Sequence, residues 1–302
     1  MGQSKDIRTN GKYTSEERTS GGVRTSDDIR RQVSEAYTRA VGRPGEGGCC
    51  GPSCCSDSGG KGVVVESAGY EATSLEALPE DAVENAFGCG NPVAFSDLKV
   101  GETVLDLGCG AGIDLLLAAL KVGPEGRVIG VDMTDEMLER ARRNIAAAGY
   151  DNVEVRKGYI EELPVEDGSM DVIISNCVLN LSPDKPRVFA EIARVLAPGG
   201  RIHISDLVAE SLPDWVRADA DLYSSCIAGA ISEEEYVQGL RAAGLGDAQV
   251  ADRFVYDITQ LEELLGSELS QGDAEQYREL LSRTSQELDG KVASIMVTGH
   301  RS

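Results

Sequence analysis

Cysteine is the residue type in this chain that most directly suggests chemistry. The sequence holds eight cysteines but only two histidines, His203 and His300. A thiolate can bind soft metals, attack electrophiles or exchange disulfides, whereas histidine is the usual general base and the commonest zinc ligand. We therefore expect reactive or metal-binding thiols and a mechanism without a histidine cluster. The cysteines are Cys49, Cys50, Cys54, Cys55, Cys89, Cys109, Cys177 and Cys226.

A glycine-rich segment from Asp106 to Gly112 lies between an apolar run and a helical pattern. Its glycines let the backbone turn sharply and approach a ligand closely. Asp132 ends the next predicted strand, where a carboxylate can accept the ribose hydroxyl hydrogens. A dinucleotide motif is disfavoured because Ile113 stands where Gly-x-Gly-x-x-Gly needs its third glycine. Asp106, two residues before the first glycine, suits a cationic sulfonium ligand with an amino-acid tail. We therefore predict S-adenosylmethionine as the cofactor.

A third segment, Gly158 to Pro164, follows the next predicted strand. In S-adenosylmethionine enzymes of this type, the segment at this position lines the adenine. Many carry an acidic residue where Tyr159 stands, so we expect the adenine contacts to shift to Ile160 and Glu161. The alternative is a solvated acidic loop. The predicted cofactor-binding residues are Asp106, Gly108, Cys109, Gly110, Gly112, Asp132, Met133, Ile160, Glu161 and Asn176.

Alternating strands and helices must position these residues. Apolar runs predict strands, and helical periodicity fills the intervals between them; the strands are at 103–107, 127–131, 153–156, 171–175 and 201–206, and the helices at 113–122, 136–148 and 185–196. This alternation predicts an α/β fold with a doubly wound, mostly parallel, Rossmann-like sheet. We expect a smaller α+β substrate or cap region at the C-terminus.

The chain divides into four predicted segments. A helix is expected to begin near Ser26, because Thr25 and Asp28 have capping-box spacing. Residues 251–302 either cap the substrate or merely complete the sheet. The segments are a disordered lead at 1–25, a helix with a cysteine-rich loop at 26–70, an S-adenosylmethionine-binding domain at 71–230 and a substrate-binding or cap region at 231–302.

Composition limits the partners. The formal net charge of −22 repels phosphate backbones and anionic lipid, so we expect neither nucleic acid nor a membrane as partner. No apolar run approaches the roughly 18 residues of a membrane span, and residues 1–10 lack a signal-peptide core. We therefore expect a cytoplasmic protein, and we expect a monomer.

Three cysteines distant in sequence are predicted to converge. Cys177 ends the fourth strand, Cys226 follows the fifth, and Cys89 lies in a glycine-flanked turn before the first. Ligands bind at the carboxyl edge of such sheets. The alternative is that each cysteine is a small buried hydrophobe, which we favour for Cys109. Three thiolates suit a soft centre such as trivalent arsenic, whose lone pair can attack a sulfonium methyl without a base.

With these residues in view, the chain resembles the arsenite methyltransferases over roughly residues 26–250. The turn around Cys89, the stretch Ser175–Lys185 and the stretch Cys226–Ala230 are the most specific matches. Other matching segments are Leu105–Asp114, Gly130–Thr134, Gly158–Glu161 and Ile204–Asp206.

The resemblance implies that Cys177 and Cys226 hold arsenic during methylation, with Cys89 as the third ligand. It implies arsenite, arriving as a thiol conjugate, as substrate, and thioredoxin or glutathione as external reductant. In the family another N-terminal cysteine exchanges disulfides with the equivalent of Cys89. This chain departs from that pattern, because it offers four candidates and nothing selects one; they are Cys49, Cys50, Cys54 and Cys55.

Two other functions remain open at this point. One is a small-molecule C- or O-methyltransferase, which shares the cofactor site and tolerates loss of the cysteines. The other is a thiol protein that sequesters soft metals on a methyltransferase fold. The doubled cysteines at 49–50 and 54–55 motivate this second alternative, although their spacing is not the usual zinc Cys-x₂-Cys.

Overall fold

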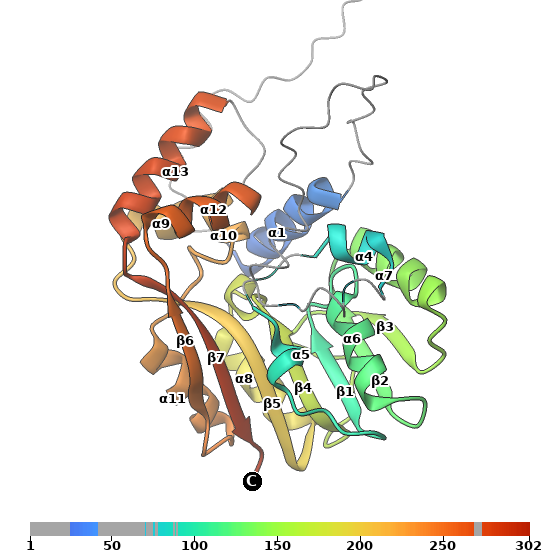
Figure 1. Cartoon of the computed structure of the whole chain (residues 1–302). Coiled ribbons are helices and arrows are strands. Elements are labelled where there is room, and N and C mark those ends of the chain that lie inside the picture. Colours follow the sequence, from blue (N-terminus) through green and yellow to red (C-terminus); the bar gives the residue numbers. More distant parts are fainter. Residues whose placement is uncertain are drawn as a thin grey trace, which may run out of the picture.

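A seven-stranded sheet forms the centre of the computed structural model (Figure 1). The structure describes residues 25–41, 70, 75, 78–86, 88, 90–268 and 274–302. The strands are β1 (Thr103–Leu107), β2 (Arg127–Asp132), β3 (Val153–Lys157), β4 (Met170–Asn176), β5 (Leu196–Ala209), β6 (Gln249–Val255) and β7 (Val292–His300). The helices are α1 (Ser26–Val41), α4 (Glu80–Glu84), α5 (Pro92–Phe95), α6 (Ile113–Val122), α7 (Asp135–Ala148), α8 (Lys185–Val195), α9 (Asp214–Ala218), α10 (Ala220–Ser224), α11 (Glu233–Ala243), α12 (Ile258–Glu268) and α13 (Ala274–Leu288).

The strand order β3-β2-β1-β4-β5-β7-β6 confirms the doubly wound prediction. The first five strands pair in parallel, and β7 pairs antiparallel with both β5 and β6. The chain reverses direction across the sheet between β1 and β4, so the carboxyl ends of these strands border a crevice. Ligands bind at such a switch point in open α/β sheets.

Each face of the sheet is covered by its own apolar layer. On one face, strand residues such as Leu105 and Ile204 pack with Phe189 of α8 and Tyr236 of α11. On the other face, strand residues such as Val104 pack with α6 and α7. Parallel strands buried on both faces need nearly continuous apolar sequence, which is the pattern that made β1 predictable.

The C-terminal strands belong to this same sheet. Strand β5 is longer than predicted at both ends, because Leu196 pairs with Met170 of β4 and the pairing with β7 continues to Ala209. Helices α12 and α13 lie between β6 and β7 in sequence, and main-chain hydrogen bonds close the base of this excursion. They run from Tyr256 N to Val292 O, 3.0 Å, and from Gly290 N to Tyr256 O, 3.1 Å. The sheet-completing alternative therefore describes β6 and β7, whereas the predicted segment boundary at 230 stays a prediction.

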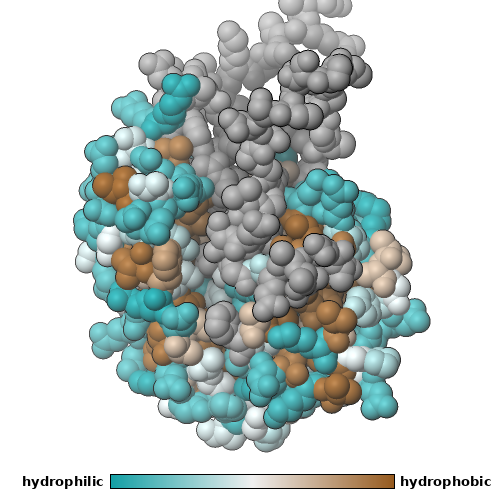
Figure 2. Space-filling model, viewed as in Figure 1, coloured by the Kyte–Doolittle hydropathy of each residue, from teal (hydrophilic) through white to brown (hydrophobic). Residues whose placement is uncertain are grey.

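Helix α1 begins as expected. The Thr25 hydroxyl donates to the Asp28 carboxylate at 2.7 Å, and the Asp28 main-chain N–H donates back to that hydroxyl at 3.2 Å. Within the described residues, no helix combines the length and the apolar character that crossing a membrane requires. The face in Figure 2 is largely hydrophilic, with separate hydrophobic groups.

Candidate active site

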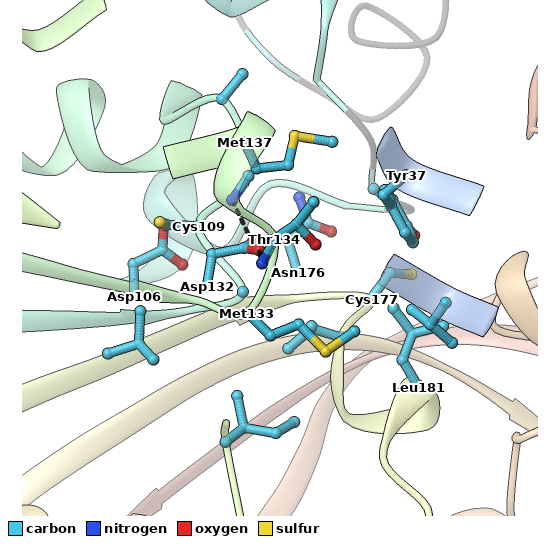
Figure 3. Close-up of a pocket in the computed structure, with 18 of the residues that line it drawn as sticks. Tyr37, Asp106, Cys109, Asp132, Met133, Thr134, Met137, Asn176, Cys177 and Leu181 are labelled. Carbon is cyan, nitrogen blue, oxygen red and sulfur yellow. Dashed lines mark hydrogen bonds between the residues drawn. The ribbon is translucent and has the colours of Figure 1, made fainter. Parts of the chain in front are cut away.

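A cleft opens where the carboxyl ends of β1, β2 and β4 meet (Figure 3). Its empty space, including the open mouth, is about 990 Å³. Nearly all of the predicted cofactor residues line it, and Gly112 does not. The predicted residues in the lining are Asp106, Gly108, Cys109, Gly110, Asp132, Met133, Ile160, Glu161 and Asn176.

The glycine loop forms the floor of this cleft. Gly108 has φ +68, and a Cβ there would collide with the Val178 side chain. Glycine at this position therefore lets the loop lie against the chain that follows β4. The Gly110 main-chain N–H donates to Asp132 Oδ2 at 3.0 Å. Gly112, with φ +96, instead starts α6 as its N-cap.

Two main-chain donors hold the Asp132 carboxylate in place. Its second oxygen accepts a hydrogen bond from the Thr134 main-chain N–H at 2.8 Å. Burial raises the pKa of this carboxyl, and the donors from Thr134 and Gly110 counteract that rise. Each oxygen of a carboxylate has a further lone pair, so the group can still accept ribose hydroxyls.

Asp106 is the polar group in the cleft that most clearly lacks a partner. It is 2% exposed, and within the described residues its Oδ2 atom has no hydrogen-bond donor. Burial raises its pKa well above the usual value, and the nearby Asp114 and Asp132 raise it further. A buried carboxylate oxygen without a donor is costly unless a cation approaches it. An ammonium group, such as that of an amino-acid tail, fits this position.

Cys109 is mainly a packing residue. A Cβ on Gly130 of β2 would lie 2.7 Å from the Cys109 sulfur, so the thiol fills the space that this glycine leaves. Burial raises the pKa of the Cys109 thiol well above its usual value, which keeps it protonated. This agrees with the prediction that Cys109 is a small buried hydrophobe.

Helix α1 supplies a wall of the cleft that sequence reasoning missed. Its residues Arg30, Val33 and Tyr37 are among the lining residues. Arg30 Nη2 donates to the buried Glu161 carboxylate at 3.1 Å, and the Arg30 guanidinium lies 5.1 Å from the centre of the Tyr159 ring. The helical spacing of Val33 and Tyr37 revealed an apolar face, but a sequence does not say which surface that face covers.

The Asn176 side chain is bound to protein groups. Its amide donates to Gly90 O at 2.6 Å and accepts from Gly90 N at 3.2 Å. It also contacts the Tyr70 hydroxyl at 3.1 Å, and that hydroxyl donates to Asp114 at 2.8 Å. A Cβ on Gly88 would lie 2.5 Å from the Asn176 amide. The predicted cofactor residue therefore anchors the chain on either side of position 89.

The structure brings two of the predicted arsenic ligands together. Cys177 lines the cleft at the end of β4, and the Cys226 sulfur donates to the Cys177 main-chain oxygen at 2.6 Å. Cys226 is 1% exposed and carries a thiol, whereas Cys177 is disulfide-bonded. The remaining candidate thiols lie outside the described residues; they are Cys49, Cys50, Cys54, Cys55 and Cys89.

Both cysteines have an unusual backbone. The φ angles are +56 at Cys177 and +64 at Cys226, which is the left-handed region that side chains other than glycine rarely occupy. Such conformations persist only where the surroundings enforce them, and they cluster at functional sites. No sequence pattern available here predicted these two conformations.

Known proteins resemble this chain in sequence and in fold. A family described as a methyltransferase domain matches residues 98–244. An arsenite methyltransferase of Halobacterium salinarum is 44% identical over 76% of this chain and 60% of its own length. One from Aquipseudomonas alcaligenes is 42% identical over 60% of this chain and 54% of its own length. The chain thus spans between 54% and 60% of these two relatives.

A solved structure matches more completely. It is an arsenic(III) S-adenosylmethionine methyltransferase from Chlamydomonas reinhardtii, 35% identical, with a TM-score of 0.59. The alignment covers 76% of this chain and 72% of the algal chain. With the glycine loop, the buried aspartates and the paired cysteines in place, this chain belongs to the arsenic(III) S-adenosylmethionine methyltransferase family.

Proposed function

We propose that this protein methylates trivalent arsenic, supplied as arsenite, with S-adenosylmethionine as the methyl donor, and so detoxifies it. The observation that carries the proposal is the pairing of Cys177 with Cys226 at a cleft that also holds Asp106 and Asp132. The first pair suits a thiophilic substrate and the second suits the donor. The named relatives support the same activity.

The described residues fit S-adenosylmethionine. When bound, this cofactor supplies a methyl group on a cationic sulfonium. Asp106 Oδ2 would accept the ammonium of the amino-acid tail, because that oxygen is buried without a donor in the described chain. Asp132 would accept the ribose hydroxyls, and the glycines at 108 and 110 allow the backbone close to the ligand. The role of the chain is then chiefly positioning.

The thiols would hold arsenic so that its lone pair faces the methyl group. Each thiol forms an As–S bond and displaces an oxygen or thiol ligand, and the thiol proton passes to the leaving group. Cys89 is the proposed third ligand. Its chain neighbours Gly88 and Gly90 both contact the Asn176 side chain, and Asn176 directly precedes Cys177. Delivery of arsenite as a thiol conjugate is part of this proposal.

An external thiol reductant is part of the proposal, and the disulfide bond of Cys177 supports it. An oxidised Cys177 has no thiolate to offer arsenic. Exchange with reduced thioredoxin or glutathione would release the thiol, as two electrons pass to the protein disulfide and the external dithiol or thiol pair is oxidised. A reducing compartment such as the cytoplasm suits this requirement.

A turnover assay tests the proposal. Reduced protein is incubated with arsenite, S-adenosylmethionine and excess thiol, and arsenic species are separated chromatographically with elemental detection. We expect methylated arsenic over several turnovers. Cofactor binding without methylated arsenic would contradict the proposal. It would then favour an organic acceptor if cysteine variants stay active on it, or sequestration if arsenite binds without turnover.

A further inference from the structure

The loops that contain Cys177 and Cys226 need contacts from outside, because nothing within either loop accounts for the unusual backbone conformation of its cysteine. Cys177 follows β4, and Cys226 follows α10 after a long excursion of the chain. Each holds a left-handed conformation, with φ +56 and +64. This conformation is unfavourable for a residue with a side chain. Contacts outside the two loops must therefore hold Cys177 and Cys226 in place relative to each other.

Asn180 is the residue that contacts both loops. It lies in the short 3₁₀ turn Leu179–Leu181, three residues after Cys177. Its main-chain carbonyl faces Gly229, three residues after Cys226, so closely that a Cβ on this glycine would collide with the carbonyl oxygen. The same carbonyl is within 3.4 Å of the Lys185 amine. Asn180 thus forms the surface on which the Cys226 loop rests.

The Asn180 side chain is in turn fixed to strand β5. Its amide donates to Asp206 Oδ1 at 2.8 Å and to the Leu207 main-chain oxygen at 2.6 Å. Asn180 is fully buried, and its Oδ1 atom has no donor within the described residues. An apolar side chain would avoid that penalty, so packing alone does not explain an asparagine here.

Asp206 completes the arrangement. It is 0% exposed and accepts hydrogen bonds from Asn180, the Leu207 main chain and the Tyr236 hydroxyl. It lies one residue beyond Ser205, whose carbonyl accepts the Cys177 main-chain N–H at 2.8 Å. A buried carboxylate is expensive, and replacing such groups with apolar residues is often stabilising. The position of Asp206 is better explained by its role in fixing the Asn180 side chain than by a gain in folding stability.

We propose that Asn180 and Asp206 form a buried clamp that sets the separation of Cys177 and Cys226, and are therefore positioning residues of the arsenic site. This inference rests on the proposed function for its biological meaning. The geometric claim concerns the two thiols alone. A two-thiol probe can therefore test it without any methyl transfer.

The experiment uses phenylarsine oxide on the fully reduced, full-length chain. One arsenic forms two As–S bonds, the oxygen leaves as water with both thiol protons, and nothing is oxidised. Peptide mass mapping measures the product in which one phenylarsenic group bridges Cys177 and Cys226. Titration gives its affinity, and a Cys177→Ser, Cys226→Ser double variant gives the background from the other thiols.

Two variants disturb the clamp from opposite sides. Asn180→Asp removes both amide donors and places a carboxylate against Asp206. Gly229→Ala leaves the buried charge alone and adds a methyl group that collides with the Asn180 carbonyl. The matched control is Asn152→Asp. The Asn152 amide likewise donates two hydrogen bonds, here to two main-chain carbonyls at 2.9 Å each, at the amino-terminal edge of the sheet.

We expect both clamp variants to bridge the two cysteines about ten-fold more weakly than the wild type, because buried partners lose their hydrogen bonds or their spacing. Asn152→Asp should bind within about two-fold, and S-adenosylmethionine affinity should change in none of them. Circular dichroism identifies the folded variants. Asp206→Asn replaces Asn180→Asp if the latter does not fold.

A folded clamp variant that bridges the cysteines as tightly as the wild type would overturn the inference. Parallel loss of arsenical and cofactor affinity would also overturn it, since that indicates general damage. If the wild type bridges the cysteines but never methylates arsenite, the proposed function fails while the clamp stands. If the wild type forms no bridge, the clamp is wrong whatever the activity.

Discussion

Cys177 and Cys226 are the residues on which the proposed reaction depends most directly. We expect Cys177→Ser and Cys226→Ser each to reduce arsenite methylation to background, because a hydroxyl is a poor ligand for a soft centre. Cofactor affinity should stay within about two-fold, since Asp106 and Asp132 are untouched. Product chromatography and calorimetric titration with S-adenosylmethionine measure the two effects. Retained methylation in either variant would exclude a three-thiol site.

The Asp206 carboxyl makes stability depend on pH. Burial raises its pKa from 3.8 to about 7. The folded protein therefore holds this proton more tightly than the unfolded chain does. The contribution of this proton to the free energy of unfolding is complete below about pH 4 and is lost as the pH rises through about 7.

Asp206→Asn removes this titration. Between about pH 5 and pH 7 we expect its unfolding free energy to fall less than that of the wild type, by up to about 1.4 kcal/mol per pH unit. Urea unfolding of both proteins at the two pH values provides the measurement. Asp114, whose pKa burial raises to about 6, contributes equally to both proteins and cancels in the comparison. Identical slopes would show that Asp206 does not titrate in this range.

For single residues, the sequence predicted the chemical role more successfully than it predicted the contacts that each residue makes. Asp132 and the glycine loop were recognisable because spacing after a strand fixes their place at the sheet edge. The Asn176 contact with Gly90 was not predictable, because it joins segments far apart in the chain. The unpartnered oxygen of Asp106 likewise emerges only from the packing around it.

Helix α1 contacts residues that line the cofactor cleft through a few polar side chains, and each of these contacts can be removed by a single substitution. Arg30→Ala deprives the buried Glu161 of its ion pair and strips a side chain from the cleft wall. We expect S-adenosylmethionine to bind about three- to ten-fold more weakly. Among the described residues, the Ser182 hydroxyl is then the one side-chain donor left to the buried carboxylate. Calorimetry measures this change.

Arg31→Ala is the matched control. Arg31 is the next residue of α1, lies exposed and pairs only with Asp28 among the ion pairs of the described residues. Surface pairs of this kind contribute little. Equal effects of the two substitutions would mean that α1 acts through general helix stability rather than through the Arg30–Glu161 contact.

The contribution of helices α12 and α13 to the arsenic site can be tested by removing both helices together. Residues such as Leu261, Leu265 and Leu288 pack in the same apolar cluster as Cys177 and Cys226, while the base of the excursion is closed by β6 and β7. We expect excision of residues 258–288, with a short glycine-rich linker, to leave a folded protein that binds cofactor but has lost most methylation. Circular dichroism, calorimetry and the arsenic assay test the three parts. Unchanged methylation would show that the excursion does not support the arsenic site.

Elements were predictable where burial imposes a pattern. Strand β1 has the predicted bounds, because parallel core strands need uninterrupted apolar residues. The extension of β5 beyond Asp206 was missed, since it depends on β7, a strand far later in the chain. The covering role of α1 was missed for the same reason, as an amphipathic face does not name the surface it meets.

At the scale of the whole molecule, the redox state of Cys177 should govern activity. Protein prepared without reductant should show no turnover until thiol is added, because Cys177 is disulfide-bonded. A thiol count before and after reduction, followed by initial rates with thioredoxin and with glutathione, measures this dependence. Full initial activity of the unreduced protein would contradict a requirement for the free Cys177 thiol.

Helix α1 contacts both α7, beside the cofactor cleft, and α10, which precedes Cys226. Thr38 donates to Glu136 of α7 on the cofactor side at 2.9 Å, and Gln32 donates to Ala220 O, ahead of Cys226, at 2.6 Å. If spent cofactor leaves past α1, each exchange loosens the enclosure of the arsenic site as well. A monomethylated intermediate then has a chance to escape at every cycle, so its yield should grow with the ratio of arsenite to enzyme. The placement of one helix would in this way decide whether methyl groups are added in a single encounter or in successive ones.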